Sequence, residues 1–302
     1  MATGYDVSAL GAYTKDNANQ LLYKVIAQGT TAKLMTVQSG VKTAERINIV
    51  STTPVPQVQA CSFTASANTV FSQRTLTVAP IGNYLKWCEK DLEAKYTQLA
   101  VKAGSNLDTL TYETQIIEDI MQQIAYNNEY AIWMGNTLST DQRLLHFDGL
   151  VKTIAAASIG ATATPVVWSI ANSRTAVQNM VASLTDDMLA QTSGKIFLGT
   201  AECRDYRQKL FQDNLFHTTG QDAKLYAEGT DIEIVPTLGL SGTKKMYFIP
   251  TDTMILGTDL ANEWENISLE YAKEAREIRF ICEYKLGCQI SVPSLIAKQV
   301  NT

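Results

Sequence analysis

The chain of 302 residues is 45% hydrophobic and 18% charged, and its formal net charge at pH 7 is −5. This balance is typical of a globular protein and excludes a disordered chain. No segment approaches the roughly 20 consecutive apolar residues that span a bilayer. The acidic balance disfavours a protein that grips nucleic acid electrostatically, although such a chain can line a container for it. The first residues lack a basic segment followed by an apolar one, so we expect no secretory signal.

Five cysteines are spread along the chain without CxxC spacing: Cys61, Cys88, Cys203, Cys282 and Cys288. An odd and dispersed set of this kind predicts reduced thiols in a protein made in the cytoplasm. Cys282 and Cys288 could contribute to a zinc site, but no further ligands stand at a matching spacing. We therefore expect no metal site.

Residues 1–44 are polar and weakly periodic, which predicts an extended N-terminal arm; a frayed terminus is the alternative for an isolated chain. The segment from Ile47 to Pro80 is more unusual, because its 34 residues contain one charged side chain, Arg74. Frequent β-branched residues and alternation at every second position predict a long β-hairpin within residues 45–82. Arms of about 17 residues would each reach about 55 Å.

A hairpin of this length and low charge exposes strand edges that promote aggregation unless something covers them. Its own domain or neighbouring subunits can provide the cover, and the residues alone leave both interpretations open. The scarcity of large apolar side chains favours neighbouring subunits. We expect inter-subunit contacts at these residues: Ile47, Ile49, Phe63, Phe71, Arg74, Leu76 and Val78.

Two helices are expected after the hairpin. Apolar side chains at helical spacing predict one from Tyr84 to about Ala100. Residues 109–133 carry the strongest helical pattern of the chain, with an apolar stripe and a candidate N-terminal cap at Thr111. This helix would be about 37 Å long and would form a strut across the body. We expect it to end at Gly135.

A small-residue linker at 155–164 indicates a boundary between subdomains, and a mixed α+β layer is expected beyond it. The expected elements are a helix at 169–184, a strand at 195–198, a helix capped by Thr200, and strands at 232–235 and 246–249. Near the C-terminus, residues 277–284 and 289–292 predict two successive strands with Gly287 at the bend between them.

No motif for catalysis or cofactor binding stands out. The two histidines are His146 and His217, and without a G-x-S-x-G motif they give no basis for a catalytic triad with Asp148. The glycine-rich segment from Gly239 to Lys245 lacks the spacing of a phosphate-binding loop. Paired acids are explained as solvated helix positions. The sequence therefore predicts no enzymatic activity and no cofactor.

The order of these segments resembles the major capsid proteins of tailed bacteriophages with the Hong-Kong-97 (HK97) type of fold. Residues 71–96 (FSQRTLTVAPIGNYLKWCEKDLEAKY) look like the descending arm of that family's E-loop hairpin and the helix after it. Residues 123–135 (QIAYNNEYAIWMG), followed by 147–150, look like the end of the spine helix and its turn. Residues 278–296 (IRFICEYKLGCQISVPSLI) look like the closing strands. The match covers nearly the whole chain, in residue type and order.

The resemblance implies an α+β capsid fold with these parts: N-terminal arm 1–44, E-loop hairpin 45–82, P domain 83–153 with the spine helix, A domain 154–258, and returning P-domain strands 259–302. It implies self-assembly as hexamers and pentamers into an icosahedral phage head around DNA, formed in the host cytoplasm, without a membrane. Portal, scaffold and decoration proteins are further candidate partners. Two alternatives stay open: an encapsulin-like compartment shell with the same fold, and a soluble α+β enzyme.

Overall fold

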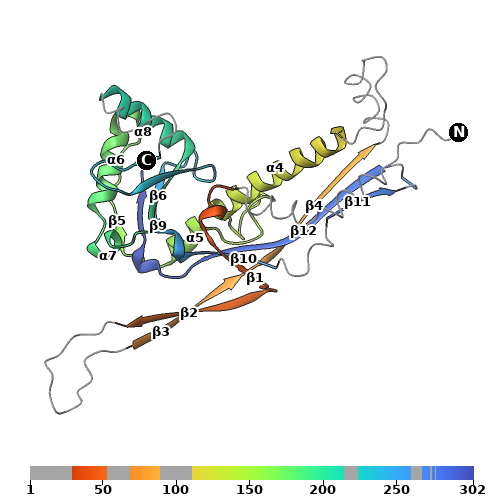
Figure 1. Ribbon diagram of the computed structural model, residues 1–302, viewed down its shortest axis with the longest axis horizontal. Helices are drawn as coiled ribbons and strands as arrows, with labels where there is room; N and C mark the ends of the chain where they lie inside the picture. The colour runs from red at the N-terminus through yellow and green to blue at the C-terminus, as the bar shows by residue number, and fades with distance from the viewer. Residues whose placement is uncertain are drawn as a thin grey trace, which may run out of the picture.

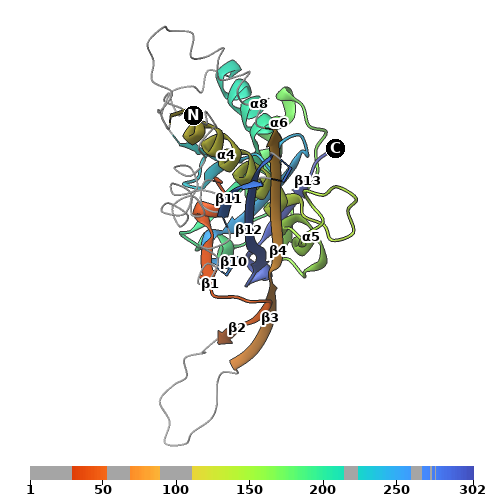
Figure 2. The same ribbon diagram turned by 90° about the vertical axis from the view of Figure 1, so that its right-hand side faces the viewer.

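The computed structural model describes residues 29–52, 69–88, 111–213, 224–259, 267–272, 274–275 and 277–302. These residues form a mixed α+β body from which a two-stranded hairpin projects (Figures 1 and 2). Two sheets make up the body, and one long helix runs along the first of them. The parts of the expected arm, hairpin tip and post-hairpin helix at 1–28, 53–68 and 89–110 lie outside the described residues.

The first sheet is built on β12 (Glu277–Ile290), whose buried and exposed positions alternate along most of its length. One side of β12 pairs with β11 (Ile267–Ala272) and then with β10 (Met254–Thr258), and β1 (Thr36–Ser39) adds in parallel to β10. The other side pairs over ten residues with β4 (Ala79–Cys88). Because β4 pairs only with β12 among the described strands, it forms an edge of this sheet.

Helix α4 (Thr111–Met134) runs along β4 and β12 in both views and confirms the expected strut. Its buried side chains include Ile117, Met121 and Ile124, four or three residues apart, as an amphipathic helix requires. The Tyr284 hydroxyl on β12 donates a hydrogen bond of 2.6 Å to Asn128 on the helix. The helix ends before Gly135, where a Cβ would lie 2.5 Å from the Phe147 carbonyl oxygen, so the expected glycine stop is confirmed.

The second sheet has six strands in the order β5-β13-β9-β6-β8-β7. These strands are β5 (Ala161–Thr162), β6 (Gly194–Gly199), β7 (Leu225–Tyr226), β8 (Glu233–Thr237), β9 (Lys245–Pro250) and β13 (Ala297–Val300). The accompanying helices are α5 (Leu150–Ala156), α6 (Ile170–Ala182), α7 (Asp186–Leu189) and α8 (Thr200–Gln212). Short 3-10 helices are η1 (Ala32–Leu34), η3 (Thr251–Thr253) and η4 (Pro293–Leu295).

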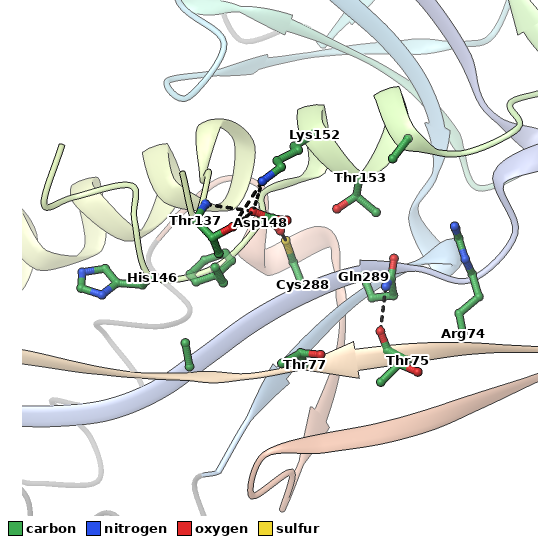
Figure 3. Close-up of a pocket in the computed structure, with 13 residues that line it drawn as sticks. Arg74, Thr75, Thr77, Thr137, His146, Asp148, Lys152, Thr153, Cys288 and Gln289 are labelled. Carbon is green, nitrogen blue, oxygen red and sulfur yellow. Dashed lines mark hydrogen bonds and ion pairs between the residues drawn. The ribbon is translucent and has the colours of Figure 1, made fainter. Parts of the chain in front are cut away.

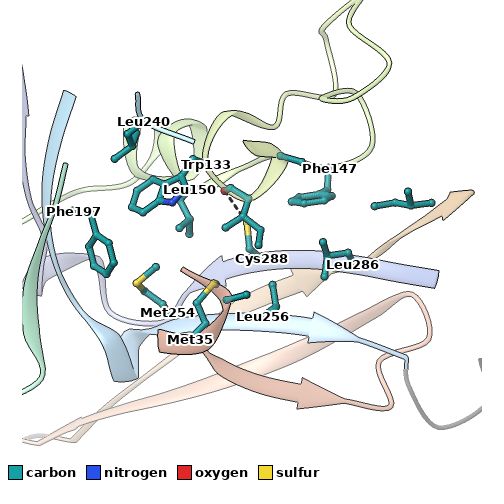
Figure 4. Packing of buried hydrophobic residues seen from close by; sticks show 14 of the residues in the cluster. Met35, Trp133, Phe147, Leu150, Phe197, Leu240, Met254, Leu256, Leu286 and Cys288 are labelled. Carbon is teal, nitrogen blue, oxygen red and sulfur yellow. Dashed lines mark hydrogen bonds between the residues drawn. The ribbon is translucent and has the colours of Figure 1, made fainter. Parts of the chain in front are cut away.

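One apolar core joins the two sheets at the end of α4. The fully buried Trp133 stacks on Tyr247 of β9 at 5.9 Å between ring centroids and lies 5.4 Å from the ring of Phe197 on β6. Figure 4 shows Met254 and Cys288, from the first sheet, in the same cluster. Since full burial of one large apolar side chain contributes about 1.5–3 kcal/mol, this shared core holds the two sheets as one body.

The hairpin consists of β2 (Ala44–Thr52) and β3 (Thr69–Thr77), which pair antiparallel from Ala44↔Thr77 to Thr52↔Thr69. This pairing confirms the expected hairpin over the described part of its arms. Only Val78 separates β3 from β4, so the hairpin continues almost directly into the edge of the first sheet.

Two expected elements at the sheet are wrong. Residues 84–88 belong to β4 and not to a helix, because the free edge of β12 supplies hydrogen-bonding partners along the whole strand, as in the pair Leu85↔Phe280. Residues 277–290 form one strand and not two, and Gly287 lies inside it. A Cβ on Gly287 would overlap the carbonyl oxygen of Thr77, so the glycine permits close chain crossing instead of a bend.

Three boundaries also differ from expectation. The N-cap of α8 is Gly199, and Thr200 is the first helical residue. The linker expected at 155–164 is shortened by α5 and interrupted by β5. The two sheets also differ from the expected division into A and P domains. Strand β10, assigned to the A domain, lies in the first sheet. Strand β13, assigned to the P domain, pairs with β9 in the second sheet. Hydrogen bonding to strands distant in sequence decides these memberships.

Candidate assembly surfaces

The projecting hairpin has two different faces. Register places Glu45, Ile47 and Ile49 opposite Leu76, Arg74 and Ser72 on one face, and Val50 opposite Phe71 on the other. Val50 is 58% and Phe71 is 75% exposed. A cross-strand apolar pair of this kind, on a ribbon whose outer edges pair with no other described strand, is a surface that a partner would cover.

The predicted contact residues divide into two groups. Leu76 and Val78 are 0% and 4% exposed and form a small core with Val41, so they cannot contact another subunit and that prediction is wrong. Ile47 is partly buried against this core. At its root, therefore, the hairpin is covered by its own chain, although the scarcity of large apolar side chains favoured cover by neighbouring subunits.

The other predicted contacts stay predictions. Phe71 is exposed, while Ile49 and Arg74 are partly buried, and Phe63 lies outside the described residues. Sequence reasoning did not select Val50 as a contact residue. Strand alternation alone would have placed Val50 with Asn48 on the face opposite that of Ile49. The pairing with Phe71 needed the register, which a single sequence does not give.

The root of the hairpin crosses the first sheet at two glycines. Gly257 of β10 pairs with Gly287 of β12, and the chain at Thr77 and Val78 passes over them. A Cβ on Gly257 would lie 2.8 Å from Val78 Cγ1 and 2.9 Å from Leu76 Cδ2. The missing side chains therefore allow the hairpin root to lie directly on the sheet, and this contact sets where the hairpin leaves the body.

A polar cleft of about 460 Å³ lies beside this crossing (Figure 3). Its lining comes from β3, the start of β4, β12, α5 and the segment before α5: Arg74, Thr75, Thr77, Ala79, Thr137, His146, Phe147, Asp148, Lys152, Thr153, Ala156, Cys288 and Gln289. Gln289 Nε2 donates to the Thr75 carbonyl oxygen at 2.8 Å, and Arg74 Nη1 donates to the Ile290 carbonyl oxygen at 3.0 Å. Both bonds tie the hairpin strand to the body.

The opposite wall of the cleft contains a closed ion-pair network. Lys152 Nζ lies 2.7 Å from Asp148 Oδ1, and that oxygen also accepts hydrogen bonds of 2.9 Å from the Thr137 amide and hydroxyl. Although partial burial opposes it, the hydrogen bonds from Lys152 and Thr137 lower the pKa of the Asp148 carboxyl. The network fixes the turn between α4 and α5 and neutralises the lysine.

A second groove of about 590 Å³ runs between α4 and the edge strand β4. Tyr84 and Leu85 contribute from the strand, and Ile120 and Ile124 from the helix. Tyr84 is 65% and Leu85 is 41% exposed. The groove therefore presents apolar side chains beside a strand edge that pairs with no further described strand, a combination that suits protein contacts better than a small polar substrate.

The described chain begins at a buried anchor on α4. The Glu129 carboxylate, 2% exposed, accepts hydrogen bonds from the Thr31 amide at 3.2 Å and from the Thr31 hydroxyl, while Trp133 Nε1 donates to that hydroxyl at 2.7 Å. Burial raises the pKa of the Glu129 carboxyl, and the hydrogen bonds from Thr31 oppose the shift. The anchor fixes the segment before η1 against α4.

The backbone amides of the glycine-rich segment at 239–245 do bind an acidic group, and this group is the Glu202 side chain of the same chain. Glu202 is 2% exposed, and its carboxylate accepts hydrogen bonds from the amides of Gly242 at 3.2 Å and Lys244 at 2.9 Å. Because Glu202 already satisfies these amides, they do not form a phosphate site.

Other candidate reactive groups are dispersed. His146 lines the polar cleft, whereas His217 lies outside the described residues. Burial raises the pKa of the Cys203 and Cys288 thiols to about 12, so both are poor nucleophiles. Within the described residues, the His, Cys, Asp and Glu side chains form no group of three that could hold a metal, and no helix is long and apolar enough to cross a membrane.

No protein-family model and no curated protein sequence matches the chain. Solved structures do match it. A chain of the satellite phage P4 procapsid, which includes the size determination (Sid) protein, aligns over 100% of this chain and 93% of its own length, with 7% identity and a TM-score of 0.63. A chain of the capsid of the native GTA particle aligns over 92% and 90%, with 11% identity and a TM-score of 0.59.

Mycobacterium phage Adephagia provides a third match, over 100% of this chain and 95% of its own, with 12% identity and a TM-score of 0.57. At such low identities the likeness concerns the fold. The chain has the phage capsid fold of the HK97 type, which confirms the resemblance and the α+β fold class expected from the sequence.

Proposed function

We propose that this chain is the major capsid protein of a tailed bacteriophage, which self-assembles as hexamers and pentamers into an icosahedral head around double-stranded DNA. The observation that carries the proposal is the projecting hairpin, whose Val50 and Phe71 side chains are exposed together on a ribbon whose outer edges pair with no other described strand. The capsid fold of its structural neighbours supports the same role.

In this proposal the hairpin lies over a neighbouring copy, and the contact is heterologous, so closure of the shell comes from symmetry. The low charge of β2 and β3 suits such a surface, because burying an unpaired charge in each of many repeated contacts would be costly. The chain would act without catalysis or cofactor, as part of the virion, after assembly in the host cytoplasm. Portal, scaffold and decoration proteins would be its other partners.

Negative-stain microscopy of the purified, overexpressed full chain tests the proposal. Closed shells, tubes or capsomers are expected, and a protein that stays monomeric at high concentration would contradict it. Phage DNA in particles purified from infected cells supports a phage head, whereas a co-purified cargo protein would indicate the encapsulin-like compartment.

Two hairpin variants sharpen this test. Phe71→Glu should stop assembly, because it places a charge at the exposed apolar pair, and it should leave the thermal midpoint of the unassembled chain unchanged. Phe71→Tyr retains the aromatic ring and should assemble. Normal shells from Phe71→Glu would show that the hairpin face is not an assembly contact.

A further inference from the structure

Arg74 is a cation in the polar cleft without a carboxylate partner among the described residues. Its partly buried guanidinium has five N–H donors, and its one hydrogen bond to a described residue goes to the Ile290 carbonyl oxygen at 3.0 Å. Lys152, the other strong cation of the cleft, is already paired with Asp148 at 2.7 Å. Partial burial lowers the pKa of Arg74, because it removes water from around the guanidinium.

The space around Arg74 fits an anionic side chain. The cleft has a volume of about 460 Å³ and is lined near β3 and α5 by the hydroxyl-bearing residues Thr75, Thr77 and Thr153. Figure 3 shows the Arg74 side chain pointing away from β3, toward the α5 side of the cleft. A planar carboxylate matches the fork of a guanidinium with two parallel hydrogen bonds, which a single carbonyl oxygen does not.

We propose that this cleft receives an aspartate or glutamate side chain from a second copy of the chain, held by Arg74. The proposal rests on the proposed function, since it requires assembly. Charge complementarity supports a second copy as the source, because the chain has 30 acidic and 25 basic residues and Arg74 is a fixed cation on an otherwise nearly uncharged arm. An acidic side chain in the cleft would contact both β3 of the hairpin and β12 of the body. It would therefore fix the orientation of the hairpin relative to the body on assembly.

The first test compares assembly of Arg74→Gln with assembly of the wild type and of Arg204→Gln. Arg204 is the control, since its side chain is 78% exposed and it lies on α8, away from the hairpin (Figure 1). Arg74→Gln should raise the protein concentration needed for assembly about tenfold at about 50 mM NaCl, and less at about 500 mM, where screening weakens the contact. Arg204→Gln should stay within about twofold of the wild type.

Three results would overturn the proposal. Equal assembly of wild type and Arg74→Gln at both salt concentrations would remove the role of Arg74 and leave the proposed function standing. An equal defect in Arg204→Gln would assign the effect to the loss of a positive charge in general. Failure of the wild type itself to assemble would contradict the proposed function and this inference with it.

The second test identifies the partner group in shells of Arg74→Lys, treated with a carbodiimide that joins amines to carboxylates in contact. The shells are assembled from a mixture of unlabelled and isotope-labelled chains, so that a link between copies joins a light peptide to a heavy one. We expect such a cross-link between residue 74 of one copy and an acidic residue of another. A cross-link within one copy would show that the chain fills its own cleft. Saturable binding of acetate by the unassembled wild type, with unchanged assembly of Arg74→Gln, would assign the cleft to a free anion. Either result would overturn the proposed source.

Discussion

Replacement of Gly287 by alanine tests whether the hairpin root depends on close chain crossing. The added Cβ would overlap the Thr77 carbonyl oxygen and lie 2.9 Å from the Val78 Cα. Both atoms belong to the backbone, so no side-chain rotation relieves the overlap. The chain between β3 and β4 must therefore move away from β10 and β12.

The expected cost follows from packing. Overpacking of a tight interior costs about 1–3 kcal/mol, and the movement also disturbs Leu76 and Val78, which are buried at the root. Loss of glycine flexibility in the unfolded chain offsets about 0.4–1 kcal/mol. We expect the free energy of unfolding to fall by about 2 kcal/mol. At about 2.1 cal/mol/K of unfolding entropy per residue, this lowers the thermal midpoint of a chain of this size by about 3 °C.

Urea unfolding of the unassembled protein measures this change, and Gly82→Ala is the matched control. Gly82 lies in β4, and its added Cβ would lie 2.6 Å from the hydroxyl of Tyr84, an exposed side chain that can rotate away. Gly82→Ala should change the free energy of unfolding by less than about 0.5 kcal/mol. Equal losses in the two variants, or none in Gly287→Ala, would refute the importance of the crossing.

Three further predictions concern buried groups. Leu76→Ala should lower the free energy of unfolding by about 2–4 kcal/mol, whereas Phe71→Ala should change it by less than about 0.5 kcal/mol in the unassembled chain; the reverse order in urea titrations would contradict the assigned faces of β3. Burial raises the pKa of Glu129 above its ordinary value of 4.5, so its contribution to stability is complete below that value and declines as the pH rises through the folded pKa. The stability of the wild type relative to Glu129→Gln should therefore fall from about pH 4 to pH 7, and a constant difference would exclude a raised pKa. Cys203 and Cys288, with pKa values of about 12, should resist a thiol reagent at about pH 8 in the native chain and react in urea; rapid native labelling of either peptide, located by mass spectrometry, would disprove their burial.

Local pattern was sufficient for the long helix and for the hairpin. The apolar stripe through Ile117, Met121 and Ile124 has helical spacing whatever it packs against, and Gly135 marks its end within the sequence itself. The low charge and alternation around Arg74 likewise predict strands before any partner is known. The order of these elements was enough to indicate the capsid fold.

Positions whose pattern fits two structures were decided by neighbours distant in the sequence. Leu85 and Cys88, three residues apart, suit one face of a helix, whereas Leu85 and Trp87 alternate as side chains of a strand do. The edge of β12 resolves the choice by hydrogen bonding to β4 over its whole length. Gly287 could end a strand or admit another chain, and only the crossing of Thr77 above it shows which.

The candidate contact residues show the same limit at the level of single side chains. The sequence by itself determined that Arg74 and Leu76 share one face of a strand, because side chains alternate with a period of two. Only the tertiary structure decided that Leu76 is buried at the hairpin root while Arg74 faces a cleft. Burial depends on what lies opposite a side chain, and here that is the pair Gly257 and Gly287, about 180 residues or more further along the chain.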